Sequence, residues 1–71
     1  MIFNDRLKLL RKEKSLTQVQ AAQALDLNYR HYQRLEADHT PNYSNLMQIA
    51  EFFDVSIDYL VGRTDVRQVN R

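Results

Sequence analysis

TQVQAAQALDLNYRHYQRLE, which spans residues 17–36, has the pattern of two short helices joined by a tight turn. Thr17 can cap the first helix, because its hydroxyl can accept a hydrogen bond from an unpaired N–H in the opening turn. Ala21, Ala22 and Leu25 then share one apolar face at helical spacing. The pattern therefore predicts an amphipathic helix over residues 18–25.

A second helix follows after a few residues. Asp26 tolerates the left-handed backbone conformation better than most residues other than glycine, so a turn can form there at modest cost. Leu27 is expected to bury its side chain beneath the turn, and Asn28 can cap a helix over residues 29–37. Together the two segments predict a helix-turn-helix over residues 17–37.

The second helix divides into two faces when it is wound at about 100° per residue. Tyr32 and Leu35 fall on the inward face. The outward face carries two guanidinium groups, an amide and a phenol, and no acid: Tyr29, Arg30, Gln33 and Arg34. Such groups can bind bases or phosphates in a major groove, whereas the alternative is a plain solvated helix face. Agreement between the first helix, the turn and the inward positions favours DNA binding.

With these features the chain resembles the phage Cro and repressor family of helix-turn-helix proteins, also called the xenobiotic-response-element family. The resemblance covers about residues 3–65. It rests on LR at 10–11, LTQ at 16–18, Ala22, LN at 27–28, RLE at 34–36 and VSIDYLVGR at 55–63. Ser15 and Asp26 depart from a common glycine, and Tyr32 from a common valine or isoleucine. The resemblance implies an all-α, five-helix, lambda-repressor-like DNA-binding domain.

The resemblance also implies roles for individual residues. It places Gln18 against a phosphate, and it pairs Arg11 with Glu36 in a structural ion pair. The expected DNA-binding set is Gln18, Asn28, Tyr29, Arg30, Gln33, Arg34, His39 and Thr40. The expected homodimer contact is Val55, Ile57, Leu60 and Val61.

The remaining helices are predicted from caps and apolar spacing. Asn4 is expected to cap a helix over residues 4–14, Asn42 a helix over 43–53, and Ser56 a helix over 57–61 that Gly62 ends. In the helix over 43–53 the expected inward residues are Leu46, Met47, Ala50 and Phe53. Leu9 lies off the apolar stripe of the helix over residues 4–14.

Length and composition set further limits. Seventy-one residues make one small domain, taken as residues 1–65 with a short tail over 66–71. A chain of this size buries only about 60% of its unfolded surface, so stability should be modest. There is no cysteine, and no apolar run reaches the roughly 18 residues that a membrane span needs. We therefore expect a cytoplasmic protein with no membrane partner.

The net charge is only +1, but the charges are unevenly distributed. Residues 1–34 contain seven basic and three acidic side chains, and residues 35–71 contain three basic and six acidic ones. One part of the molecule can therefore face phosphates while the other faces away.

The sequence favours a sequence-specific transcriptional regulator, a repressor that binds a pseudo-palindromic DNA operator as a homodimer, from a phage or mobile element. The alternatives are an antitoxin that neutralises a partner protein and regulates its own synthesis, and the N-terminal domain of a longer regulator. An enzyme is not expected, since no nucleophile–base pair or paired carboxylates stand out. His31 and His39 have no acidic or thiol companions for a metal, and neither a cofactor nor a small-molecule substrate is expected. The tail from Arg63 onward is left open as a frayed end, a linker or a dimer segment.

Overall fold

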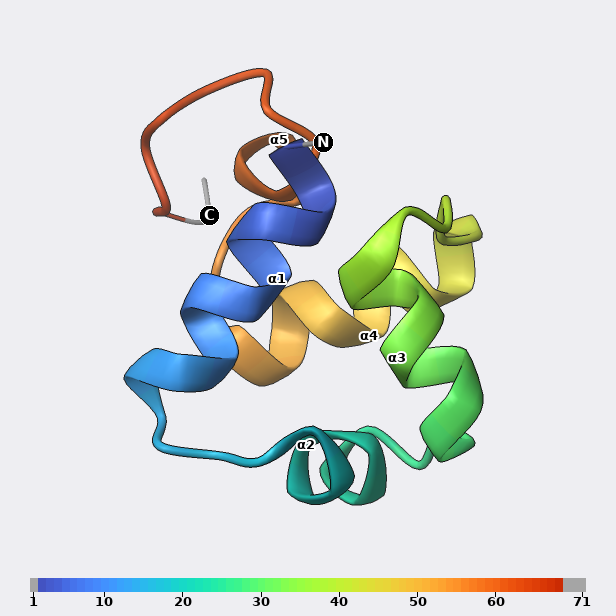
Figure 1. Cartoon of the computed structure of the whole chain (residues 1–71). Helices are drawn as coiled ribbons and strands as arrows, with labels where there is room; N and C mark the ends of the chain where they lie inside the picture. The colour runs from blue at the N-terminus through green and yellow to red at the C-terminus, as the bar shows by residue number, and fades with distance from the viewer. Residues whose placement is uncertain (1, 69–71) are drawn as a thin grey trace.

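The structure is a computed structural model that describes residues 2–68, and within that range the chain forms five α-helices and no β-strand (Figure 1). The helices are α1 (Ile2–Glu13), α2 (Gln18–Ala24), α3 (Tyr29–Ala37), α4 (Tyr43–Phe53) and α5 (Ile57–Leu60). The all-α, five-helix prediction is confirmed: α3 and α4 have the expected bounds, and the other helix ends lie within two residues of the expected ones. Met1 and residues 69–71, which the predicted domain and tail include, lie outside the described range.

Polar caps set the start of four helices. Thr17, Asn28, Asn42 and Ser56 each accept a hydrogen bond from a backbone N–H in the first turn that follows. Thr17 also forms a reciprocal capping box with Gln20. These N–H groups have no partner within the helix, so each cap fixes where a short helix begins. The four predicted caps are confirmed.

Residues with a left-handed backbone end the helices and turn the chain. Asp26 (φ 54°) and Gly62 (φ 84°) have the predicted roles, and Ser15 and Asp54 adopt the same conformation. At Gly62 a side chain would also meet an obstacle, because an added Cβ would lie 2.8 Å from Cγ2 of Ile2. The end of α5 therefore lies close against the start of α1.

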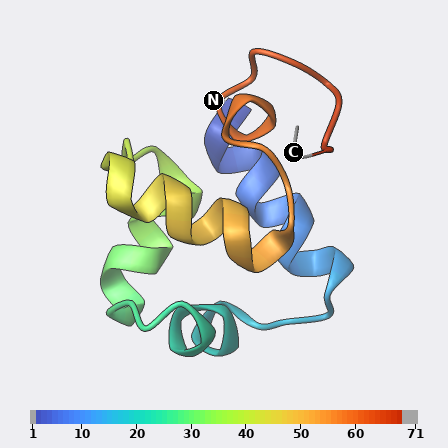
Figure 2. The same ribbon diagram turned by 180° about the vertical axis from the view of Figure 1, so that it is seen from behind.

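Helix α4 runs across the back of the view in Figure 1, from the loop after α3 to the start of α5 (Figure 2). Its buried apolar residues are Ile49, Ala50 and Phe53, with Leu46 packed at the edge of the core. The prediction of Met47 as an inward residue is wrong, because its side chain is exposed. Positions 46, 49, 50 and 53 follow one helical stripe, whereas position 47 lies off it.

The start of α1 also differs from the prediction. Helix α1 begins at Ile2, and Asn4 is a buried residue within it rather than its cap. The Asn4 amide donates hydrogen bonds to the backbone oxygens of Leu35 (2.6 Å) and His39 (3.3 Å). The last carbonyl groups of a helix lack partners within that helix. Asn4 therefore stabilises the end of α3 instead of the start of α1.

Glu36 is a buried acid near the end of α3 that joins three helices. Its carboxylate accepts hydrogen bonds from Arg11 Nε (2.6 Å) and Nη2 (3.2 Å) of α1, and from Gln18 Nε2 (3.1 Å) of α2. Arg11 Nη1 also donates to the backbone oxygen of Leu16 at 2.8 Å. The expected ion pair is therefore present, and only 2% of the Glu36 side chain is exposed.

This network sets the charge state of its members. Burial acts to raise the pKa of Glu36, but the neighbouring Arg11 guanidinium, Tyr32 hydroxyl and Gln18 amide outweigh it and hold the pKa below its ordinary value. The hydrogen bond with Glu36 raises the pKa of Arg11. The Tyr32 hydroxyl is buried beside the pair without a well-formed hydrogen bond, and burial raises the pKa of this tyrosine.

Residues 63–68 fold back beside α1 and α5 (Figure 1). Arg6 donates to the backbone oxygen of Thr64 (2.6 Å) and to the carboxylate of Asp65 (2.7 Å). Arg67 forms two hydrogen bonds with the Glu13 carboxylate, at 2.7 and 2.8 Å. The guanidinium carbons of Arg6 and Arg67 lie 4.2 and 5.3 Å from the centre of the Tyr59 ring. Over these residues the C-terminal segment is attached to the domain rather than frayed.

No helix between Ile2 and Gln68 combines the length and the apolar character that crossing a lipid bilayer requires.

Replacing Glu36 with glutamine keeps the size of the side chain but removes the charge that Arg11 pairs with. One charge of a buried pair is then left without its partner, so we expect the free energy of unfolding at pH 7 to fall by about 3 kcal/mol. The pKa of Glu36 is lower in the folded protein than in the unfolded chain. The wild-type advantage is therefore complete above the unfolded pKa of about 4.3 and is lost as the pH falls through the folded pKa.

Urea unfolding of both proteins at pH 7 and at about pH 3 measures this difference. Glu51→Gln on the exposed side of α4 is the matched control, with an expected change below about 0.5 kcal/mol. A Glu36→Gln deficit of the same size at both pH values would show that the carboxylate charge is not what stabilises the fold.

Candidate nucleic-acid interface

Helices α2 and α3 and the turn between them carry most of the predicted DNA-binding residues. Ala21 and Ala22 of α2 are buried, and these short side chains let α3 pack closely against α2. Leu25 closes α2, Asp26 turns the chain, and the N–H of Leu27 bonds to the oxygen of Ala22 at 2.8 Å. The backbone of α3 is therefore held at a fixed angle to α2.

Helix α3 buries one face and exposes the other. Tyr32, Leu35 and Glu36 are buried. The exposed face carries the four residues expected there: Tyr29, Arg30, Gln33 and Arg34. The one acid of α3 is the buried, paired Glu36, so the exposed face of α3 has two cations and no anion. This charge distribution suits a polyanion.

Two predicted DNA-binding residues have structural roles at the edges of this face. Asn28 uses its side-chain oxygen to cap α3, accepting from the N–H groups of Arg30 (2.9 Å) and His31 (3.4 Å). Its amide nitrogen makes no hydrogen bond within residues 2–68 and can donate to an external acceptor. Gln18 is half-buried and donates to Glu36, which fixes its side chain between α2 and the end of α3. The structure thus places Gln18 as a brace of α3.

His39 and Thr40 follow α3 in the loop that leads to α4, and both are exposed. The ring of His39 meets the ring of His31 edge to face, with centroids 6.0 Å apart. His31 Nε2 lies 3.3 Å from Asn45 Nδ2 on α4, a contact that the sequence interpretation missed because it joins residues 14 positions apart. Among residues 2–68 no group of three or more His, Cys, Asp or Glu side chains is placed to hold a metal ion.

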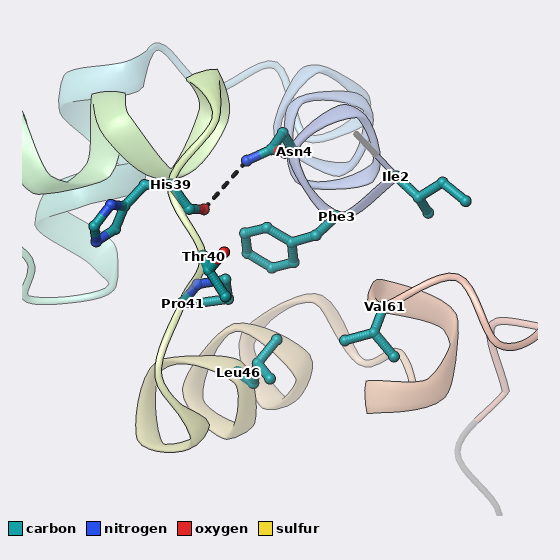
Figure 3. Close-up of a pocket in the computed structure, with 8 residues that line it drawn as sticks. All are labelled: Ile2, Phe3, Asn4, His39, Thr40, Pro41, Leu46 and Val61. Atoms are coloured by element: carbon teal, nitrogen blue, oxygen red, sulfur yellow. Dashed lines mark hydrogen bonds between the residues drawn. The ribbon is translucent and has the colours of Figure 1, made fainter.

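A small pocket lies between the start of α1, the loop after α3 and the end of α5 (Figure 3). Phe3, Leu46 and Val61 supply much of its apolar wall, and the Asn4 amide points past it to the His39 backbone oxygen. Its volume is about 210 Å³. Pockets that bind small molecules usually enclose roughly 300–1,000 Å³, so this one is small for a ligand.

The expected dimer residues do not all reach the surface. Val55 and Leu60 are buried in the core of the protomer, so their side chains are not available to a second chain. Ile57 is partly buried, and Val61 is 40% exposed. The apolar character of this segment comes mainly from core packing between α5, α4 and α1. The sequence could not separate these two causes because both require apolar residues.

The hydrogen bond between Tyr29 and Gln33 is a further feature that the sequence interpretation missed. Gln33 Nε2 donates to the hydroxyl of Tyr29 at 2.8 Å, on the exposed face of α3. The spacing of four residues was available as a signal, because side chains at i and i+4 are neighbours on a helix.

Comparison with known proteins agrees with this geometry. The family model described as helix-turn-helix matches residues 7–60. The chain is 42% identical over 65 residues to the HTH-type transcriptional regulator PrpR of Mycobacterium tuberculosis, covering 90% of this chain and 13% of that protein. It is 31% identical over 71 residues to the HTH-type transcriptional regulator ImmR of Bacillus subtilis, covering 99% of this chain and 56% of that protein.

A third relative is the uncharacterized HTH-type transcriptional regulator YqaE of Bacillus subtilis, 38% identical over 61 residues, covering 84% of this chain and 53% of that protein. The chain therefore spans little more than half the length of ImmR and of YqaE, and a small part of PrpR. No solved structure matches at a significant level. The match over residues 7–60 includes α2, the turn and α3, and the chain belongs to the helix-turn-helix family of DNA-binding proteins.

Proposed function

We propose that this chain is a transcriptional regulator that binds a pseudo-palindromic DNA operator as a homodimer and represses by occupying the promoter. The observation that carries the proposal is the exposed face of α3, which presents Arg30, Arg34, Gln33 and Tyr29 without an acid. These groups match the acceptors, donors and methyl groups that base pairs present in a major groove. The names of the relatives, which are transcriptional regulators, support the proposal.

We propose that some of these residues contact bases and that others contact the DNA backbone. Arg30, near the start of α3, is exposed, and its guanidinium suits a bidentate contact with guanine. Arg34 stands one turn further on and is suited to a base or a phosphate. Gln18, His39 and Thr40 are proposed to meet the DNA backbone, which fixes the register of α3 without reading sequence.

A second candidate function follows from the lengths of the relatives. Because the chain covers between 13% and 56% of the proteins named above, it can serve as the DNA-binding domain of a longer regulator. Residues 63–68, held against α1 and α5, would then set the direction in which a following segment leaves the domain. The proposed role of α3 is the same in both cases.

Replacing Arg30 with alanine is expected to weaken binding to the best operator by about 1–3 kcal/mol and to relax the preference mainly at one base pair of each half-site. The measurement is binding to a panel of single-base operator variants at fixed salt, with the operator first selected from random duplexes. Arg63→Ala, which removes the same charge from an exposed site after α5, is the control and should leave base preference unchanged. If Arg30→Ala lost affinity equally for all duplexes of the panel, Arg30 would instead contact the DNA backbone.

The proposed homodimer uses the part of the α5 surface that remains accessible, at Ile57 and Val61. A single helix reads about four base pairs, which is too few to distinguish an operator from the rest of a genome. Two half-sites about 34 Å apart double the number of base pairs that are read. We expect two protomers per operator by sedimentation, and we expect Val61→Asp to lower affinity and the two-protomer fraction together. One wild-type protomer per operator at saturation would contradict the dimer.

A further inference from the structure

Tyr29 and Gln33 form a pair one helical turn apart on the exposed face of α3. The side-chain Nε2 of Gln33 donates a hydrogen bond of 2.8 Å to the hydroxyl of Tyr29. Within residues 2–68, Gln33 makes no other side-chain hydrogen bond. The orientation of its amide is therefore set by Tyr29 alone.

The geometry decides which groups of the amide remain for a ligand. A glutamine side chain has two N–H donors and one carbonyl acceptor. One N–H is used by Tyr29, which leaves one N–H and the carbonyl oxygen. In the major groove adenine presents an acceptor, N7, next to a donor, the N6 amino group. Guanine presents two acceptors, N7 and O6, and the remaining groups of Gln33 cannot satisfy both.

We propose that Gln33 reads adenine at one base pair of the bound DNA and that Tyr29 is the positioning residue that holds the Gln33 amide for this contact. The inference rests on the proposed function, DNA binding through α3, and it adds the identity of one base and the residue that orients its reader. A flexible side chain loses rotamer freedom when it binds, and a side chain that is already held loses less. The Tyr29 hydroxyl therefore acts on base preference more than on general affinity.

The test measures binding of several variants to duplexes that the wild-type chain selects from a random pool and to their single-base changes. Gln33→Ala removes the reader, and Tyr29→Phe removes only the hydroxyl while it keeps the ring. The double variant closes a cycle that isolates the coupling between the two residues. Tyr43→Phe is the matched control, because Tyr43 on α4 is 68% exposed and its hydroxyl makes no hydrogen bond within residues 2–68.

We expect the wild-type chain to prefer adenine by about tenfold or more at one base pair, and Gln33→Ala to abolish this preference. Tyr29→Phe should reduce the preference by about fivefold. It should have no further effect at that base pair in the Gln33→Ala background. Tyr43→Phe should leave the preference unchanged.

Two results would overturn the inference while leaving DNA binding intact. One is a guanine preference that depends on Gln33, which would require both amide N–H groups to face the DNA. The other is a uniform loss of affinity in Tyr29→Phe that persists in the Gln33→Ala background, which would mean that the hydroxyl contacts the DNA backbone. A wild-type chain that binds none of the duplexes would instead contradict the proposed function.

Discussion

The structure depends on one buried carboxylate. Glu36 near the end of α3 is exposed over only 2% of its side chain, so its charge must be satisfied within the protein. Arg11 from α1 and Gln18 from α2 supply the donors, and Arg11 also reaches the backbone of Leu16 before α2. A network of this kind has few alternative arrangements because each donor and acceptor has a direction. It therefore fixes α3 relative to α1 and α2, which a small apolar core would do with less angular precision.

The same constraint explains how a small domain presents a defined binding face. Buried residues of α3 connect to the network and to the core, and the opposite residues project into solvent. The polar termini of α3 are also held, by Asn28 at its start and by Asn4 at its end. The exposed face is thus supported by its surroundings and not by contacts among its own cations. The one acid of α3 is the buried, paired Glu36, so the exposed face of α3 carries no anion.

Much of this arrangement was predictable from residues that act locally. Thr17, Asn28 and Ser56 cap helices, and Asp26 and Gly62 turn the chain, because each effect involves neighbours within a few positions. Effects between distant residues were not predictable from the same rules. Asn4 is of a residue type that is common at helix caps, but its amide donates to backbone oxygens at and after the end of α3. Val55 and Leu60 pack in the core of the protomer and are not available to a second chain. The contacts of Arg6 and Arg67 with Tyr59 join segments from the two ends of the chain.

We infer that the exposed face of α3, held by the Glu36 network, is the surface that meets DNA. The most direct test follows the backbone amide chemical shifts of the isotopically labelled chain as a duplex selected from a random pool is added. We expect the largest changes at Gln18, at Tyr29 to Arg34, and at His39 and Thr40, with small changes at Glu51 and Asp58. Large changes confined to α4 and α5, with α3 unaffected, would contradict it.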